Sequence, residues 1–202
     1  YDNLGDTVKQ LLKSSSELFP KGDFEDGIYD GGSESAKRVN TDEEACGGLR
    51  SLKISDMKYS WSGLRLTLPE TTDRKFRMSF DIKGKKGDSV QVIYRYHHPT
   101  DWDNSEDKFI TSKYTQLQSD EWNHVMFDID AAGKADGTCI EFNYNNWKDG
   151  FYYIDNISLI DMTEVYLMQK ACESMPQAKK IIDKIIEDAE VTVDKLSEAM
   201  AE

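Results

Sequence analysis

Long apolar runs, cysteine pairs at metal-ligand spacing and an excess of basic charge are all missing from this 202-residue chain. No run approaches the roughly 20 apolar residues that a membrane-spanning helix needs, so membrane insertion is not expected. The cysteines, Cys46, Cys139 and Cys172, show no CxxC spacing, which argues against zinc and leaves open whether Cys46 pairs with Cys139. The net charge of −13 disfavours nucleic acid and anionic lipid as partners, because like charges repel.

Catalytic signatures are missing as well. The chain has no GxSxG elbow, P-loop or HExxH motif. Carboxylates such as Asp128, Asp130 and Glu141 are plentiful, but a glycosidase needs two of them about 5–9.5 Å apart, and density alone does not indicate such a pair. We therefore expect no catalysis. Because the chain opens at Tyr1 without a signal peptide, we also expect a processed or excised segment.

Aromatic residues, by contrast, are abundant, and 10 Tyr, 8 Phe and 4 Trp argue against a disordered chain. Between residues 17 and 161, apolar and polar residues alternate with the two-residue period of half-buried strands. The clearest runs are Phe76–Lys83, Val90–His97 and Ile140–Asn145. Turn-forming clusters separate these runs. Many alternating strands without helical segments between them predict a mostly β fold, an antiparallel β-sandwich.

Both ends of the chain have helical spacing instead. In residues 1–16 the apolar residues recur every three or four positions, and residues 162–202 predict one helix from Thr163 and a second with Pro176 in its first turn. The apolar stripe from Met175 to Met200 is of coiled-coil type. We expect N- and C-terminal α-helical extensions that pack on each other or on the sandwich. A spacer or oligomerisation helix is the alternative.

Four segments carry a family resemblance, in the order Leu18–Gly27, Gly48–Ile54, Phe76–Lys83 and Phe151–Leu159. They resemble the N-L-x-x-N-G-D-F-E-x-G opening, the G-x-x-S-L-K-V and Y-x-F-S-F-x-V-K strands and the F-Y-I-D-D-V-S-L close of bacterial carbohydrate-binding modules. Trp61-Ser62-Gly63 is similar to the W-x-G of the xylan-binding family twenty-two. The resemblance covers residues 17–161. It implies a β-jelly-roll that binds polysaccharide without catalysis.

Rigid aromatic rings can stack on the apolar faces of sugars, while amides and guanidinium groups reach the hydroxyls. Trp61, Trp102 and Trp147 lie among polar neighbours, and Arg38 falls near the family's ligand-binding arginine. Tyr144 with Asn145 lies near the family's Y-x-E contact, although the glutamate is absent. The predicted sugar contacts are Trp61, Arg38, Tyr144, Asn145, Trp147, Trp102, Arg95 and Tyr96. The alternatives are that Trp61 covers the edge of the core and that the other predicted contacts are ordinary solvent-exposed residues of the sheet.

The resemblance also implies a structural Ca²⁺ that is remote from the sugar. Glu25 and Asp155 match the family's side-chain ligands, and Asp23 would supply a backbone oxygen. Carboxylates and carbonyls are the ligands that this hard cation prefers. The alternative is that Glu25 and Asp155 only accept hydrogen bonds from the backbone.

Taken together, these patterns predict a non-catalytic module, secreted or on the cell surface. It would hold a glycanase, whose catalytic domain lies in the same parent chain, close to plant cell-wall polysaccharide such as xylan or another β-glycan. Two alternatives stay open, a protein-interaction or spacer module of a surface protein and a small polysaccharide-degrading catalytic domain.

Overall fold

The computed structural model describes residues 17–26, 35–71, 73–96, 108–132, 137–171, 176–177 and 179–188. Ten strands lie within these residues. They are β1 (Lys37–Thr41), β2 (Ser51–Ser55), β3 (Arg65–Thr71), β4 (Arg74–Lys83), β5 (Ser89–Tyr96), β6 (Lys108–Thr111), β7 (Thr115–Gln116), β8 (Asn123–Ala131), β9 (Gly137–Tyr144) and β10 (Tyr152–Asp161).

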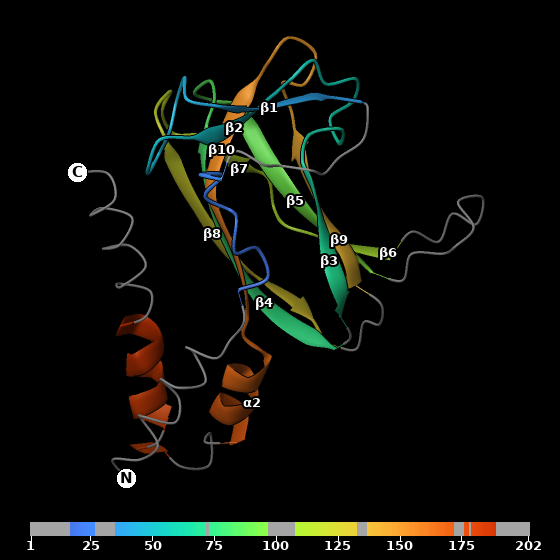
Figure 1. Ribbon diagram of the computed structural model, residues 1–202. Coiled ribbons are helices and arrows are strands. Elements are labelled where there is room, and N and C mark those ends of the chain that lie inside the picture. Colours follow the sequence, from blue (N-terminus) through green and yellow to red (C-terminus); the bar gives the residue numbers. More distant parts are fainter. Residues whose placement is uncertain are drawn as a thin grey trace.

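The strands form two antiparallel sheets that pack face to face (Figure 1). Sheet A has the order β1-β2-β10-β4-β8, and sheet B has the order β3-β9-β5-β6 with β7 paired to β5. The antiparallel β-sandwich that the alternation predicts is therefore confirmed.

Alternation along each strand fills the space between the sheets. In β4, Phe76, Met78, Phe80 and Ile82 are fully buried in the common core. The intervening residues face outward, and Arg77, for example, pairs with Asp128 of β8. Inward residues of sheet B, including Val92 and Phe142, complete the core.

The two ends of the sandwich segment meet beside the last strand. Glu17 forms a bridge with Ile160 of β10, and the N–H of Leu18 donates to the carbonyl oxygen of Leu159 at 3.0 Å. The Glu17 carboxylate also accepts the N–H of Leu159 and the hydroxyl of Ser158. The chain thus enters the sandwich next to the point where it leaves.

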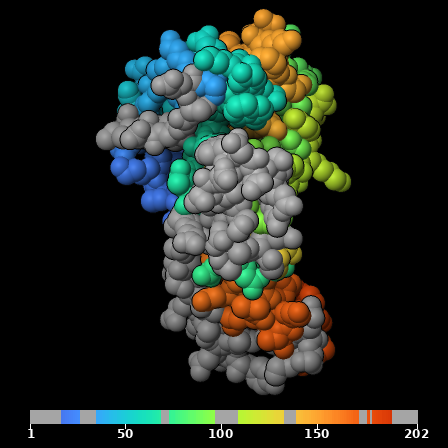
Figure 2. Space-filling view, turned by 90° about the vertical axis from the view of Figure 1, so that its right-hand side faces the viewer, coloured from blue at the N-terminus to red at the C-terminus, as the bar shows by residue number. Residues whose placement is uncertain are grey.

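Helix α2 (Thr163–Ala171) follows β10 directly. The Thr163 hydroxyl accepts the N–H of Lys75, which ties the start of the helix to β4. A second helical stretch, residues 179–188, packs on α2 through buried Ile182 and Ile185, in contact with Met168. Figure 2 shows these helical residues, in orange and red, at one end of the sandwich. The predicted C-terminal helices are thereby confirmed over Thr163–Ala171 and residues 179–188. The rest of the stripe that runs to Met200 and the predicted helix in residues 1–16 lie outside the described residues.

None of the helical segments in the described part of the chain is long and apolar enough to cross a membrane.

Tyr166 joins α2 to the outer face of sheet A. Its hydroxyl donates to Asp128, and the ammonium of Lys75 lies 5.2 Å from its ring centroid. Burial raises the pKa of Asp128, but hydrogen bonds from Arg77 and Tyr166 outweigh burial and hold that pKa below its ordinary value. Burial and the Asp128 carboxylate raise the pKa of Tyr166 to about 12.

We expect Tyr166→Phe to lower the free energy of unfolding by about 1 kcal/mol at neutral pH, because one hydrogen bond to a charged group is lost. A carboxyl whose folded pKa is lowered stabilises the fold above its ordinary pKa, and this stability is lost as the pH falls through the folded value. The variant should therefore lose less stability than the parent when the pH falls below 3.8, the ordinary pKa of Asp128. Urea unfolding at two pH values measures both effects. Tyr114→Phe, at an exposed position, is the matched control and should change neither.

Candidate functional site

Three aromatic side chains gather at the end of the sandwich where β10 begins. We call Tyr59, Trp61 and Trp147 the aromatic cluster. The rings of Tyr59 and Trp61 stack with centroids 4.8 Å apart and planes 5° from parallel. The ring centroids of Trp147 and Tyr59 lie 6.4 Å apart, and the ammonium of Lys148 lies over the Trp147 ring. Tyr59 is 49% exposed and Trp61 46% exposed, so large apolar rings are held open to solvent.

A tight turn before β3 positions Tyr59 and Trp61. The N–H and the hydroxyl of Ser62 both donate to the carbonyl oxygen of Tyr59, at 3.1 and 2.8 Å. The segment then runs beside β9, where the N–H of Tyr144 donates to the carbonyl oxygen of Ser60. These bonds fix the backbone on both sides of Trp61, so its indole is supported by a sheet edge.

Arg38 supports this turn from β1. Its guanidinium donates to the carbonyl oxygens of Ala36, Ser62 and Gly63. The sequence predicts Arg38 as a sugar contact, whereas the structure uses these N–H groups to hold the turn that carries Trp61. Arg38 is therefore a positioning residue in this structure.

The β9–β10 loop supplies Trp147. At its start the Asn145 side chain accepts the N–H of Ser89 at 2.7 Å, which anchors the loop to β5. Tyr144, immediately before it, is fully buried and donates its hydroxyl to Asp88 at 2.7 Å. Burial and the neighbouring Asp88 carboxylate raise the pKa of Tyr144 far above its ordinary value. This corrects the predicted sugar contact at Tyr144, because its ring has no exposed surface.

The outer face of sheet B carries a polar network beside the cluster. Glu141 of β9 is buried between Arg95 of β5 and Arg65 of β3 and pairs with both guanidinium groups. Asn143 donates to Gln91 on the next strand. Arg95 thus lies on the outer face of sheet B, with its guanidinium partly engaged by Glu141.

Tyr96 has the same parity along β5 as the core residue Tyr94, and their rings lie 6.4 Å apart. It is half-buried and packs partly against the core, so its role as a sugar contact stays a prediction. Trp102 lies outside the described residues. Sequence reasoning missed Tyr59 and the pairing role of Glu141. A tyrosine two positions before a tryptophan in a turn was the available signal for Tyr59.

The residues predicted to bind calcium converge on one loop. Glu25 Oε1 accepts the N–H groups of Leu49 and Arg50, each at 2.8 Å. Asp155 Oδ2 accepts those of Cys46 and Gly47, at 2.9 and 3.4 Å. We call Glu25, Asp155 and loop 46–50 the carboxylate clamp. The Asp23 side chain accepts the N–H of Glu25 at 3.4 Å, and its predicted backbone contact to calcium stays a prediction.

These bonds match the alternative in which the carboxylates bind the backbone. The described residues contain no group of three or more His, Cys, Asp or Glu side chains placed to hold a metal ion. Two observations still fit a cation. Glu25 Oε2 accepts no hydrogen bond from the described residues, and burial raises the pKa of the fully buried Asp155 to about 7. A cation here would take its other oxygens from backbone carbonyls.

No disulfide joins Cys46 to Cys139 in the structure, so the pairing left open by the sequence is not formed. Burial raises the pKa of Cys46 to about 12, which keeps its thiol protonated at neutral pH.

The fold is that of β-sandwich carbohydrate-binding modules. It is similar to the CBM22-1 xylan-binding domain of Paenibacillus barcinonensis Xyn10C (TM-score 0.58, 15% identity, covering 69% of this chain and 91% of that one). It is also similar to the C-terminal family 22 module of Clostridium thermocellum Xyn10B (TM-score 0.57, 14% identity, 69% and 90%). No protein-family model matches the sequence, and no curated protein matches it. At these identities the likeness establishes the fold.

We expect Arg38→Ala to lower the free energy of unfolding by about 2 kcal/mol, because several hydrogen bonds are lost and part-buried carbonyls are left without this donor. Looser packing of the turn should increase acrylamide quenching of tryptophan fluorescence. The adjacent, exposed Lys37→Ala is the control and should leave both stability and quenching unchanged. Equal stability of Arg38→Ala and the parent would contradict the positioning role.

Proposed function

We propose that this chain is a non-catalytic carbohydrate-binding module whose aromatic cluster binds the glycan. One observation carries the proposal. Two loops that are far apart in sequence place Tyr59, Trp61 and Trp147 together at one end, with the first two about half exposed. Exposing such rings costs free energy in water, and a partner with apolar ring faces would recover it.

The energetics support weak and adjustable binding. One stacked sugar ring removes on the order of 50–80 Å² of apolar surface, worth about 1–2 kcal/mol at 25 cal/mol/Å². Two or three such contacts, less the cost of ordering, correspond to micromolar to millimolar affinity.

Polar groups on the outer face of sheet B complement the rings. Arg95, Gln91 and Asn143 are partly exposed there, and their N–H groups and oxygens suit sugar hydroxyls. The net charge of −13 favours neutral glycans over acidic ones.

Within this role, xylan or another plant cell-wall β-glycan is the polymer we propose. The similar folds described as xylan-binding support this choice. We further propose that the module is secreted or displayed on the cell surface, and that it keeps a glycanase domain of the same parent chain near its substrate. The similar fold of the CBM22-1-CBM22-2 tandem domain from Paenibacillus barcinonensis Xyn10C supports only the first part of this arrangement, a module joined to a further domain in one chain.

We expect Trp61→Ala to weaken binding to xylan by about 5–30-fold, because one stacking contact is worth about 1–2 kcal/mol. Affinity electrophoresis in gels containing xylan, mixed-linkage glucan or mannan measures this as lost retardation. The matched control is Leu167→Ala on α2, which removes an exposed apolar side chain at the opposite end.

Each rival function has its own result in this experiment. No retardation in any gel, with concentration-dependent dimerisation, would favour the interaction module. Release of reducing sugar by the parent chain would favour a catalytic domain. Retardation that survives Trp61→Ala unchanged would remove the cluster from the glycan site.

We also propose that Ca²⁺ reinforces the carboxylate clamp. Convergence of Glu25 and Asp155 on a single loop supports this, as does Glu25 Oε2, which accepts no hydrogen bond from the described residues. The ion would join the opening turn to β10, away from the aromatic cluster.

We expect a chelator to lower the melting temperature, and added Ca²⁺ to restore it, without a change in glycan preference. Glu25→Gln sharpens the test, because its amide oxygen can still accept both N–H groups while the charge is lost. Its melting temperature should not respond to the chelator. Superimposable melting curves of the parent with and without chelator would mean that the hydrogen bonds act alone.

A further inference from the structure

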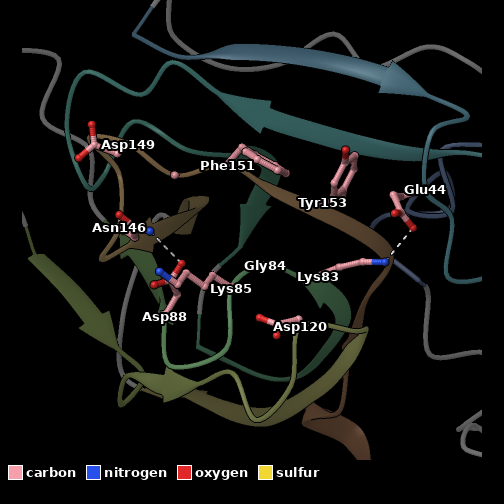
Figure 3. Close-up of a pocket in the computed structure, with 11 residues that line it drawn as sticks. Glu44, Lys83, Gly84, Lys85, Asp88, Asp120, Asn146, Asp149, Phe151 and Tyr153 are labelled. Atoms are coloured by element: carbon pink, nitrogen blue, oxygen red, sulfur yellow. Dashed lines mark hydrogen bonds and ion pairs between the residues drawn. The ribbon is translucent and has the colours of Figure 1, made fainter.

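A cavity of about 360 Å³ opens at the same end of the sandwich and is lined by residues outside the aromatic cluster. Its walls come from the end of β4, the β4–β5 turn, the β9–β10 loop and the start of β10. In Figure 3, Phe151 and Tyr153 lie along one side, and Asp88, Lys85 and Asp120 lie opposite. This volume falls within the roughly 300–1,000 Å³ of small-molecule sites.

Phe151 gives the cavity an apolar wall. Its side chain is 50% exposed, although its ring is held from two sides. The ammonium of Lys53 lies 5.1 Å from the ring centroid, and the ring of Tyr153 meets it edge-on at 5.7 Å. The exposed part of a fixed phenyl ring is a surface on which a sugar ring can pack.

Polar groups face this wall in fixed positions. Asp88 Oδ2 accepts the Tyr144 hydroxyl at 2.7 Å and the Asn146 amide at 3.1 Å, which aligns its carboxylate. Its Oδ1 accepts no hydrogen bond from the described residues. At the base of the cavity, the backbone of Gly84 packs directly on the Tyr144 hydroxyl. Only glycine allows this, because a Cβ there would lie 2.5 Å from the hydroxyl oxygen.

The charges of the lining select the class of ligand. Four carboxylates and two ammonium groups border the cavity, and Lys83 is already paired with Glu44 at 2.9 Å. Excess carboxylate disfavours phosphate or uronic acid. A polyol, by contrast, donates to carboxylates, accepts from ammonium and amide groups, and offers C–H faces to a phenyl ring.

We propose that this cavity is a second binding site, for a neutral saccharide of one to a few sugar units. The inference extends the proposed function, but it depends on a different set of side chains. The lining contains neither Trp61 nor Trp147. The β9–β10 loop contributes to both sites, with Trp147 in one and Asn146 and Phe151 in the other.

NMR titration of the full chain tests this proposal, because each site has its own reporters. The backbone amides of Gly84 and Gly150 report on the cavity, and the indole N–H groups of Trp61 and Trp147 report on the cluster. The probes are xylotriose, cellotriose, mannotriose and β-1,4-galactotriose, with inorganic phosphate and putrescine as charged comparators. We expect at least one neutral trisaccharide to shift the Gly84 and Gly150 amides in the parent and in Trp61→Ala. In Phe151→Ala this binding should weaken about tenfold, with the indole response retained.

Asp149→Asn is the second variant, since it alters a lining charge at an exposed position without changing shape. It should weaken binding at the cavity alone, and Met126→Ala, exposed on β8, should weaken neither site. No shift at Gly84 or Gly150 with any neutral probe would overturn the second site, whatever the indoles do. Loss of those shifts in Trp61→Ala, or a response to phosphate or putrescine alone, would overturn it too. Shifts of the Gly84 and Gly150 amides without any shift of the indole N–H signals would support the second site and contradict glycan binding by the aromatic cluster.

Discussion

Two buried phenols at the loop end of the sandwich, Tyr144 and Tyr152, support both candidate surfaces. Their rings pack with centroids 4.7 Å apart at the edge of the core. Gly63, in the turn that carries Trp61, and Gly84, in the cavity floor, each approach one of these hydroxyls so closely that a Cβ would lie 2.5 Å from its oxygen. The backbone closes onto the phenols only because both residues are glycine. The aromatic cluster and the cavity are therefore built on a shared pair of core side chains.

The balance of charges explains why neutral ligands suit this molecule. Several cationic side chains on the outer faces are already paired across strands, as Arg77 is with Asp128 and Arg95 with Glu141. The chain as a whole carries a net charge of −13, which repels anions. Binding must then depend on ring faces and on hydroxyl contacts, which are individually weak.

Alternation of apolar and polar residues was sufficient to predict the strands, because burial of one sheet face imposes a two-residue period. The run from Phe76 to Lys83 became β4, and the inward residues are those the pattern selects. The same period would have excluded Tyr144 from the surface, since it continues the inward series of Ile140 and Phe142. The family resemblance instead predicted Tyr144 as a sugar contact, but its ring is buried in the core.

What the sequence could not supply was contact between distant loops. Tyr59 joins the cluster only because the turn before β3 lies beside the β9–β10 loop, and Glu141 meets Arg65 and Arg95 only in one strand register. Neither the register nor the arrangement of loops follows from local spacing. The motifs put Glu25 and Asp155 together in one predicted calcium site. That both carboxylates accept N–H groups of loop 46–50 depends on backbone geometry that spacing does not encode.

The adjacent entry and exit of the chain have a mechanical consequence. Glu17 pairs with Ile160 near the end of β10 from which α2 departs, whereas the aromatic cluster lies by the start of that strand, about 26 Å away along it. Tension pulling through both flanking segments would load the short Glu17–Ile160 junction and bypass the rest of the sheets. A force on a domain attached through these segments would therefore leave the aromatic cluster at the opposite end of the sandwich undistorted.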